Sequence, residues 1–307
     1  MPEVAGSGLR HMVLLYGDRS EYLSAVGDFV RAGLSRGEPV LMAVPSGSML
    51  PDWLSSPGQV TVLPMTELGR NPARVIPAIR EFADKHVGRP VRIISEWVWP
   101  GRSSAEMCEG VRHEALVDRA LADVPAVIAC PYDVVALPSR TLADAAHTHR
   151  WQLGMAAIRA SAAYAGPDAM PASCRLALPN PPADAEEIRY VSDLRPVRAM
   201  VTSAARRAGL AASKVTDLMI AVSEVAANTL RHTKAGGTAH AWQCDGEVLC
   251  QVSDTGYITD PLAGLRHPPT GEPGGQGLWV VNQVCDLVEL RSSEAGTQVR
   301  LHMRIPS

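Results

Sequence analysis

The chain has 307 residues, with 29 Lys or Arg against 32 Asp or Glu and a formal net charge of −3. This length suits two domains of ordinary size, each large enough to bury its own core. A weakly acidic chain with dispersed basic residues lacks the positive patch that nucleic acid requires, so direct nucleic-acid binding is not expected.

The N-terminal segment carries an apolar run of only a few residues, which is too short for a secretory signal or a membrane span. We therefore expect a cytoplasmic protein that makes no membrane contact. The six cysteines include no C-x-x-C pair, a pattern that suggests neither a disulfide framework nor a zinc site. Most are expected to be buried as small apolar residues. They are Cys108, Cys130, Cys174, Cys244, Cys250 and Cys285.

Residues 1–145 alternate between short apolar runs and longer amphipathic stretches. Continuous apolar runs are typical of strands covered on both faces, and helical spacing of apolar residues predicts helices. The alternation predicts a mostly parallel sheet between helices, a three-layer α/β domain. The expected strands are 11–16, 39–44, 59–63, 91–95 and 126–130, and the expected helices are 20–36 with Ser20 as N-cap, 72–86 and 103–121.

Three features of this first domain carry a family resemblance. His11 lies in the first expected strand, residues 106–116 read EMCEGVRHEAL, and an apolar strand ends in Cys130-Pro131-Tyr132-Asp133. This layout resembles the MEDS sensory domain. The resemblance implies a degenerate RecA-like fold that has lost its nucleotide loop, and indeed no G-x-x-x-x-G-K-[ST] motif follows the first strand. It also implies an input domain for a small-molecule or redox signal.

The polar residues of this domain have simpler interpretations. We expect His11, Trp97, Glu114 and Tyr132 to be core or rim residues. The pair His113-Glu114 is similar to a histidine-kinase phospho-acceptor, but no long helical hairpin follows it, as a dimeric phospho-acceptor bundle requires.

Residues 146–190 are expected to connect two domains. The segment 143–164 is alanine-rich and compatible with a helix, whereas 166–185 is dense in proline, which favours extended chain. His147 and His149 form H-x-H, but metal binding is disfavoured without acidic or cysteine partners at ligand spacing.

Residues 191–307 show a second α/β pattern. Alternating strands are joined at Asp245-Gly246, a strong hairpin signal. Helices on one face of a mixed sheet would form a two-layer α/β sandwich. The expected helices are 197–208 and 213–232, with Ser213 as N-cap of the second, and the expected strands are 239–244, 247–252, 287–291 and 298–305.

Three sequence motifs follow one another in this domain and contain its candidate functional residues. In AVSEVAANTLRHT, Glu224, Asn228 and His232 are four residues apart and share one helix face. The run VSDTGYITDP then contains Asp254-x-Gly256, and GGQGLWVV opens an apolar helix with a glycine cluster.

This order resembles the N, G1 and G2 boxes of the GHKL ATPase superfamily, over about residues 185–307. The ending GLWVVNQVCDLVELRSS makes it most similar to serine kinases of the anti-sigma-factor type, in their actinobacterial branch. The resemblance implies ATP and Mg²⁺ as cofactors. It assigns Asn228 to the metal, Glu224 to the catalytic base and Asp254 to the adenine amino group, with Gly256 beside the ring.

The resemblance also assigns the phosphates to backbone N–H groups of the glycine cluster, at Gly274, Gly275 and Gly277, and of the helix that starts at Leu278. His232 either lies near the phosphates or caps its helix. Two departures are the short proline-rich segment 259–273, where histidine kinases carry a longer lid, and Ile258 in place of a second glycine.

The resulting hypothesis is a sensory domain that controls an ATP-dependent serine/threonine protein kinase. Its expected partners are an anti-sigma-factor antagonist and a sigma factor. A homodimer is common in this family, although the sequence identifies no interface. Two alternatives stay open: a sensor histidine kinase-like protein, which the missing phospho-acceptor bundle disfavours, and an ATP-responsive protein-binding switch without phosphotransfer.

Overall fold

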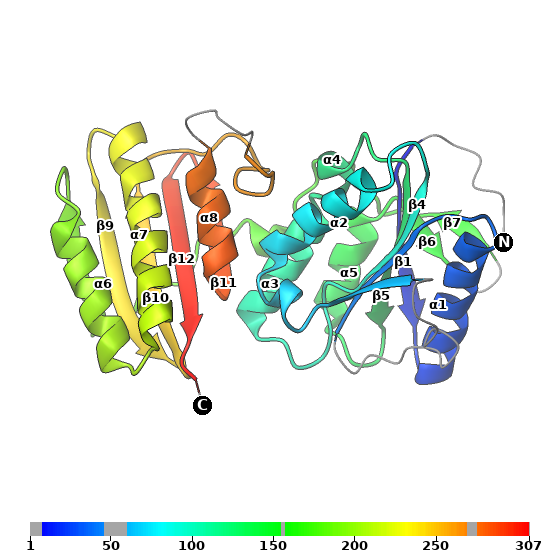
Figure 1. The fold of residues 1–307 in the computed structure, drawn as a ribbon, viewed down its shortest axis with the longest axis horizontal. Helices are drawn as coiled ribbons and strands as arrows, with labels where there is room; N and C mark the ends of the chain where they lie inside the picture. The colour runs from blue at the N-terminus through cyan, green and yellow to red at the C-terminus, as the bar shows by residue number, and fades with distance from the viewer. Residues whose placement is uncertain (1–7, 46–59, 155–156, 269–274, 307) are drawn as a thin grey trace. The chain divides into compact units, whose positions relative to one another are not determined.

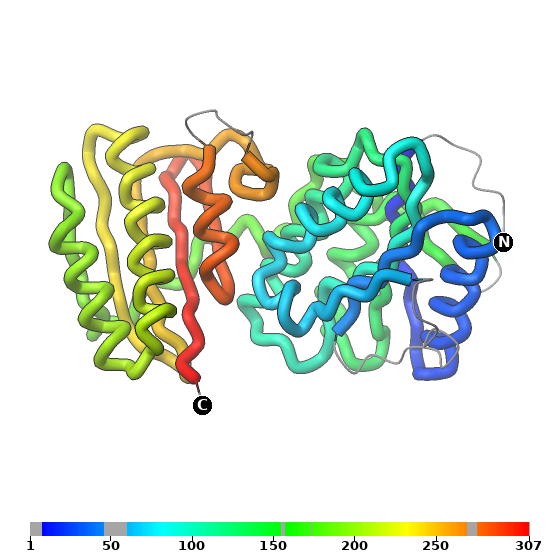
Figure 2. The backbone as a smooth tube through the Cα atoms, viewed as in Figure 1, coloured from blue at the N-terminus to red at the C-terminus, as the bar shows by residue number. Residues whose placement is uncertain are grey.

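The computed structural model describes residues 8–45, 60–154, 157–268 and 275–306. The chain divides into two compact units, residues 1–174 and 175–307. The units follow one another along the chain, as the colours of Figures 1 and 2 show. The predicted domain limits, at residues 145 and 191, stay a prediction.

A largely parallel sheet forms the centre of the N-terminal unit. Within the described residues its order is β3-β2-β4-β5-β1-β6-β7, and every neighbouring pair is parallel except β6 and β7. The central strands consist almost entirely of buried residues because helices cover both faces. The strands are β1 (Arg10–Tyr16), β2 (Val40–Val44), β3 (Val60–Pro64), β4 (Val91–Ser95), β5 (Ala126–Asp133), β6 (Trp151–Leu153) and β7 (Ile158–Ala160).

Helices on the two faces make this unit three-layered, as the alternating pattern predicts. Helix α1 packs its apolar side, including Val26 and Phe29, against alternate strand residues such as Met12. Figure 1 shows α1 on one side of the sheet and α3 and α5 on the other. The helical elements are α1 (Arg19–Leu34), η2 (Leu68–Arg70), η3 (Pro72–Arg74), α2 (Val75–Asp84), α3 (Ser104–Glu114), α4 (Val117–Ala120), α5 (Ser139–Thr148) and η4 (Ala172–Cys174).

Two local predictions for this unit are wrong in detail. Asp18, not Ser20, caps α1, because its carboxylate accepts the Glu21 N–H at 2.9 Å. The helix expected over residues 103–121 is interrupted after Glu114, where α3 ends and α4 begins three residues later.

The segment 146–190 contributes to both units. The alanine-rich stretch does not form a helix to residue 164, because α5 ends at Thr148 and Trp151 then pairs with Met12 at the sheet edge. Further on, the Leu178 N–H donates to the Gln298 side chain at 3.0 Å, and Arg300 donates to the Pro179 carbonyl. Residues 178 and 179 of the proline-rich stretch are therefore bound to strand β12 of the C-terminal sheet.

The C-terminal sheet has the order β11-β12-β10-β9-β8 among the described residues, and each neighbouring pair is antiparallel. The predicted mixed sheet is therefore wrong. Two consecutive helices return the chain to the end of the sheet where β8 finished, so β9 runs back beside it. The strands are β8 (Glu186–Tyr190), β9 (Gly237–Cys244), β10 (Glu247–Asp254), β11 (Leu287–Ser293) and β12 (Gly296–Arg304).

The predicted hairpin between β9 and β10 is confirmed. Cys244 pairs with Glu247, and the two turn residues Asp245 and Gly246 have φ of 49° and 75°. Positive φ at both positions is the geometry that matches the twist of a two-residue hairpin.

Within the described part of this unit, three helices cover one face of the sheet and give the predicted two-layer sandwich (Figure 1). Leu218 and Val222 of the second helix join Cys250 and Leu301 of the sheet in one apolar core. The helices are α6 (Arg195–Arg207), α7 (Ala212–His232) and α8 (Gln276–Val284).

The opposite face of the sheet carries a polar network centred on His302. Its Nδ1 lies 2.8 Å from a Glu247 oxygen and its Nε2 lies 3.0 Å from a Glu289 oxygen. Burial opposes a charge on this imidazole, but the two carboxylates outweigh burial and raise its pKa.

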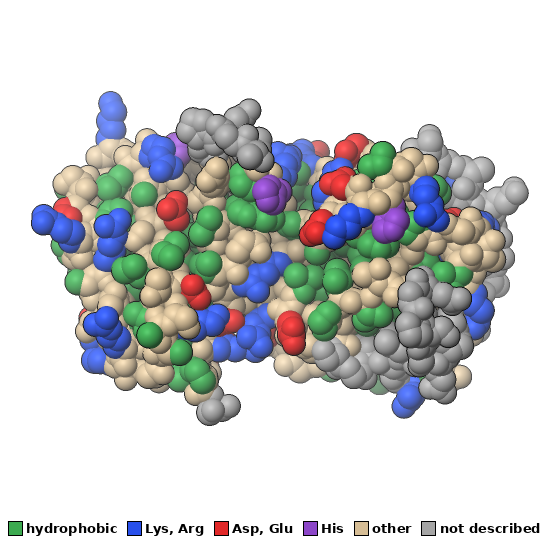
Figure 3. Space-filling model, in the orientation of Figure 1, with side chains coloured by type: hydrophobic (Ala, Val, Ile, Leu, Met, Phe, Trp, Pro, Cys, Tyr) green, Lys and Arg blue, Asp and Glu red, His purple; other side chains and the backbone are tan. Residues whose placement is uncertain are grey.

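On the face that Figure 3 shows, acidic and basic side chains both occur on each of the two units. None of the described helices combines the length and apolar character that a membrane crossing demands.

Candidate nucleotide-binding site

Helix α7 presents two rows of side chains. Its apolar row, which includes Leu218, Val222 and Val225, is buried in the core. Its polar row places Glu224 and Asn228 one turn apart, both half-buried. The predicted N-cap is wrong, because Ala211 precedes the helix without a side-chain cap and Ser213 lies in the first turn.

The first turn of α8 lies directly against this polar row. A Cβ added to Gly277 would lie 2.9 Å from a Glu224 carboxylate oxygen and 3.3 Å from the Asn228 amide nitrogen. Glycine therefore permits an approach that no other residue allows without displacing these side chains. Gly275 precedes α8 with φ of 76°, a left-handed conformation that favours glycine.

Backbone N–H groups of a helix's first turn have no partner within the helix, which makes this end suited to anions. The structure thus brings Glu224 and Asn228 together with Gly277 at such an end. Leu278, in the same turn, packs against the backbone near Gly264, whose carbonyl accepts a hydrogen bond from Asn282 at 3.0 Å. Gly274 lies outside the described residues.

The Asp254 carboxylate is fixed by donors from two segments. One oxygen accepts the Gly256 N–H at 2.7 Å, and the other accepts the Thr229 hydroxyl at 2.5 Å. The Thr297 hydroxyl donates to the Gly256 carbonyl at 2.8 Å and holds the turn against β12. An Asp held this way at the end of β10 is oriented before any ligand arrives.

The tight packing behind Asp254 involves Tyr190 and Gly237. A Cβ added to Gly237 would lie 2.7 Å from the Tyr190 hydroxyl oxygen. Burial, and then the negative charge of Asp254, raise the pKa of Tyr190 to about 12, so this phenol is neutral near pH 7.

Sequence reasoning missed three of these residues: Thr229, Thr297 and Tyr190. A signal existed only for Thr229, which directly follows Asn228 but falls on the apolar row of the helix. The other two come from strands distant in sequence. His232, in contrast, is the exposed last residue of α7, and its predicted place near the phosphates stays a prediction.

The residues at the site fit a nucleotide with a divalent cation. The Asn228 amide oxygen accepts a hydrogen bond from the Arg231 guanidinium at 2.6 Å, and its second lone pair remains for a cation. A carboxylate one turn away and a glycine-lined helix end complete a donor set of oxygen ligands and backbone N–H groups, which suits Mg²⁺ and phosphate.

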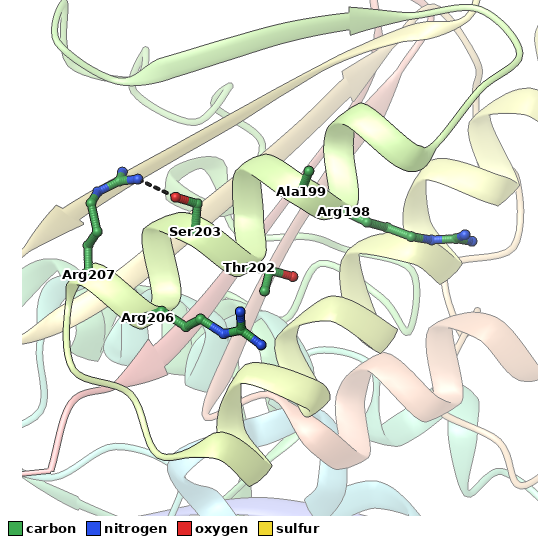
Figure 4. A pocket seen from close by; sticks show the side chains of 6 residues that line it. All are labelled: Arg198, Ala199, Thr202, Ser203, Arg206 and Arg207. Carbon is green, nitrogen blue, oxygen red and sulfur yellow. Dashed lines mark hydrogen bonds between the residues drawn. The ribbon is translucent and has the colours of Figure 1, made fainter.

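A separate shallow hollow follows the exposed side of α6 (Figure 4). Its lining includes three arginines, of which Arg207 donates to Ser203 at 2.6 Å and Arg198 donates to Ser223 at 2.9 Å. None of the predicted nucleotide residues lines it. The lining residues are Arg198, Ala199, Thr202, Ser203, Arg206 and Arg207.

Comparisons with known families agree with both predicted resemblances. Residues 190–303 match the family model of the histidine kinase-like ATPase domain. Residues 10–150 match that of the MEDS domain, described as the methanogen/methylotroph, DcmR sensory domain. The chain therefore joins a MEDS sensory domain to a histidine kinase-like ATPase domain, and the two resemblances are confirmed at the level of these two domain families.

No curated protein matches the chain. Among solved structures, the chain is similar to the RsbU and RsbW domains of a Mycobacterium tuberculosis protein, with 21% identity and a TM-score of 0.30. The match covers 40% of this chain and 33% of that one, so it spans about a third of the solved chain. A likeness at this level carries no argument about function.

Proposed function

We propose that the C-terminal domain binds ATP with Mg²⁺ and acts as a serine/threonine protein kinase of the anti-sigma-factor type, under control of the N-terminal domain. The observation that carries this proposal is the meeting of Glu224, Asn228 and Gly277 at the N-terminal end of α8. The anchored Asp254 carboxylate beside it supports the adenine end of the same site.

Each residue has a role that its chemistry allows. Asn228 would hold Mg²⁺ through its amide oxygen, and the cation, when bound, offsets the charge of the triphosphate. Asp254 would accept a hydrogen bond from the adenine amino group. The N–H groups at Gly275, Gly277 and Leu278 would donate to phosphate oxygens, and Gly274 is proposed for the same role.

Glu224 is the proposed catalytic base. It would accept the proton of a serine or threonine hydroxyl on the partner protein, while that oxygen attacks the γ-phosphorus and ADP leaves. The expected partner is an anti-sigma-factor antagonist, with a sigma factor as the second partner whose release regulates transcription.

The histidine-kinase alternative finds no support in the sensory domain. His113 is only 2% exposed, and its Nδ1 lies 2.7 Å from the Glu109 carbonyl within α3. A phospho-acceptor must be reached by the γ-phosphate, which such burial prevents. The second candidate, an ATP-responsive switch without phosphotransfer, uses the same binding residues and differs only in the role of Glu224.

Binding is tested by titration of the full chain with a fluorescent ATP analogue and Mg²⁺. The comparison is wild type against Asn228→Ala and Asp254→Ala, with Asp217→Asn, two turns before Glu224 on α7, as a matched control. We expect saturable binding by wild type and the control, and loss in both site variants. If the wild-type chain did not bind the ATP analogue, the proposal would be wrong.

Phosphotransfer is tested with Glu224→Gln and γ-labelled ATP in the presence of an anti-sigma-factor antagonist. A kinase should lose transfer while it still binds ATP. A switch would show no transfer in either form. Acid-labile label on the chain itself would instead restore the histidine-kinase alternative.

A further inference from the structure

A cluster of buried side chains of the types that bind metals lies within the N-terminal unit. It contains His11, Glu114, Cys130 and His149, each no more than 2% exposed. One potential ligand atom from each residue lies within 4.8 Å of the corresponding atoms of the other three. Burying polar groups without partners costs free energy, so four such groups in one place need partners or a shared ligand that offsets this cost.

The fold explains how four distant segments meet. β1 and β5 are parallel neighbours in which His11 pairs with Ile128, so His11 and Cys130 project from the same face of the sheet. Glu114 ends α3 and His149 follows α5, and Figure 1 shows both helices on one side of these strands. Each ligand is thus held by a regular element or by its end.

Both imidazoles are oriented by an outer partner. His11 Nδ1 lies 3.1 Å from an Asp118 carboxylate oxygen, and its Nε2 lies 3.3 Å from the Cys130 sulfur. His149 Nδ1 lies 2.8 Å from the Ala145 carbonyl oxygen, and its Nε2 lies 3.3 Å from Glu114 Oε1. Nδ1–H donation to an oxygen, with Nε2 left facing inward, is the arrangement that metal-ligating histidines show.

Two atoms of the cluster are left without a donor. Glu114 Oε1 and His149 Nε2 are buried and have no hydrogen-bond partner. With Nδ1 protonated, His149 Nε2 offers only a lone pair, and it faces another lone pair on the carboxylate. A positive charge between them is required, either a proton or a metal ion. The second Glu114 oxygen accepts a hydrogen bond from the Tyr132 hydroxyl.

We propose that His11, Glu114, Cys130 and His149 form a four-coordinate site for Zn²⁺ or a divalent transition metal of similar preference. Two imidazole nitrogens, one sulfur and one carboxylate oxygen match the ligands of tetrahedral zinc and not the all-oxygen sets of Ca²⁺ or Mg²⁺. The thiolate and the carboxylate together offset both charges of the ion. On binding, the thiol proton of Cys130 passes to solvent, and no electron is transferred.

The distances need little adjustment to accept the ion. Metal–ligand bonds of about 2.0 to 2.3 Å in a tetrahedron place ligand atoms roughly 3.3 to 3.8 Å apart. Two pairs of ligand atoms in the cluster are already 3.3 Å apart. The other ligand atoms lie within 4.8 Å of one another, so they would close by at most ~1.5 Å, which is within the reach of side-chain rotation.

A catalytic alternative is less consistent with the structure. Cys130, His11 and Asp118 follow one another in the order of a nucleophile, a base and an orienting acid. Cys130, however, has no exposed surface, and a nucleophile must reach a substrate. Burial is no obstacle to a metal whose four ligands all come from the protein, as in structural sites.

The decisive measurement uses the full chain, stripped by a chelator and titrated with Co²⁺. We expect stoichiometric binding, with intense visible absorption of tetrahedral cobalt, a thiolate-to-cobalt charge-transfer band and loss of both bands when Zn²⁺ is added. Cys130→Ser should abolish the charge-transfer band, whereas Cys108→Ser should keep it. His149→Ala should weaken affinity by at least ~100-fold, whereas His147→Ala, at an exposed position two residues earlier, should not.

Measurements on the wild-type protein are sufficient to overturn the proposal, even if the variants fail to fold. Absence of the tetrahedral cobalt spectrum, together with no zinc retained by protein purified from zinc-supplemented cells, would mean that only protons occupy the cluster. Cobalt binding by His149→Ala with the affinity of the wild type would place the metal elsewhere and would likewise overturn it.

Discussion

Gly277 and Glu224 are in such close contact that a Cβ at position 277 would stand 2.9 Å from the Glu224 carboxylate. The contact joins the helix that carries the proposed base to the helix end proposed for the phosphates. It explains why a glycine occupies a helical position where alanine would be more favourable by about 1 kcal/mol.

We predict that Gly277→Ala lowers phosphotransfer more than it lowers ATP affinity. The added methyl group displaces the flexible Glu224 side chain, and a misplacement of about 1 Å can cost ~100-fold in rate. The helix itself should not be weakened, so the midpoint of thermal unfolding should not fall. Steady-state kinetics beside analogue titration separate the two effects. Gln283→Ala, exposed in the last turn of α8, is the control, and equal activity of both variants would contradict the prediction.

We predict that Thr229→Val weakens ATP binding. The change keeps the buried volume but removes the hydroxyl that donates to Asp254 at 2.5 Å. Loss of a hydrogen bond to a charged group costs about 1.5 kcal/mol or more, which is roughly tenfold in affinity. The fluorescent-analogue titration measures it, with Thr216→Val at an exposed position of α7 as control. Unchanged affinity would show that Asp254 is positioned without Thr229.

Local sequence patterns are sufficient to predict the residues proposed for the nucleotide because their spacing is local. Glu224 and Asn228 are one helical turn apart, and Asp254-x-Gly256 forms its own turn. Helical periodicity places Thr229 on the apolar row of α7, where it is buried, but it does not show which atom the Thr229 hydroxyl reaches. The antiparallel direction of the C-terminal sheet likewise depends on pairings that no single segment specifies.

The buried cluster of His11, Glu114, Cys130 and His149 could not be predicted from local sequence patterns. His11 and Cys130 are 119 residues apart and meet only because β1 and β5 are neighbours in the sheet. Metal motifs are recognised in sequence when ligands are closely spaced, whereas the four proposed ligands come from β1, α3, β5 and the residue that follows α5. The H-x-H pair, for which metal binding was disfavoured, supplies His149 to the cluster, while His147 is exposed.

We predict that Glu96 makes the sensory domain less stable as pH rises. Burial raises the pKa of this carboxyl to about 8, whereas in the unfolded chain it ionises near about 4.3. Between these values the folded state binds the extra proton, so stability falls across that window and levels off above it. The expected loss is on the order of a few kcal/mol, because each unit of pKa difference contributes about 1.4 kcal/mol.

Urea unfolding of wild type and Glu96→Gln at a series of pH values tests this dependence. The amide cannot ionise, so the variant should keep a nearly constant midpoint where wild type declines. Glu67→Gln removes an exposed carboxyl from the same domain and should behave as wild type. A decline of the same size in Glu96→Gln would assign the pH dependence to other groups.

Asp118 provides a test of the metal site that spares its ligands. The carboxylate lies 3.1 Å from His11 Nδ1, and its other oxygen accepts the Tyr164 hydroxyl at 2.8 Å. Asp118→Asn keeps the size of the side chain but removes its negative charge. That charge orients the His11 imidazole and raises the basicity of its Nε2 as a metal ligand. We therefore predict metal affinity lower by ~10-fold to ~100-fold, with the tetrahedral cobalt spectrum retained. Competition between the protein and a chromophoric chelator measures the affinity, and the exposed Asp123→Asn is the control. Equal affinity in wild type and Asp118→Asn would show that this carboxylate only fills space, whereas complete loss of the spectrum would make Asp118 itself a ligand.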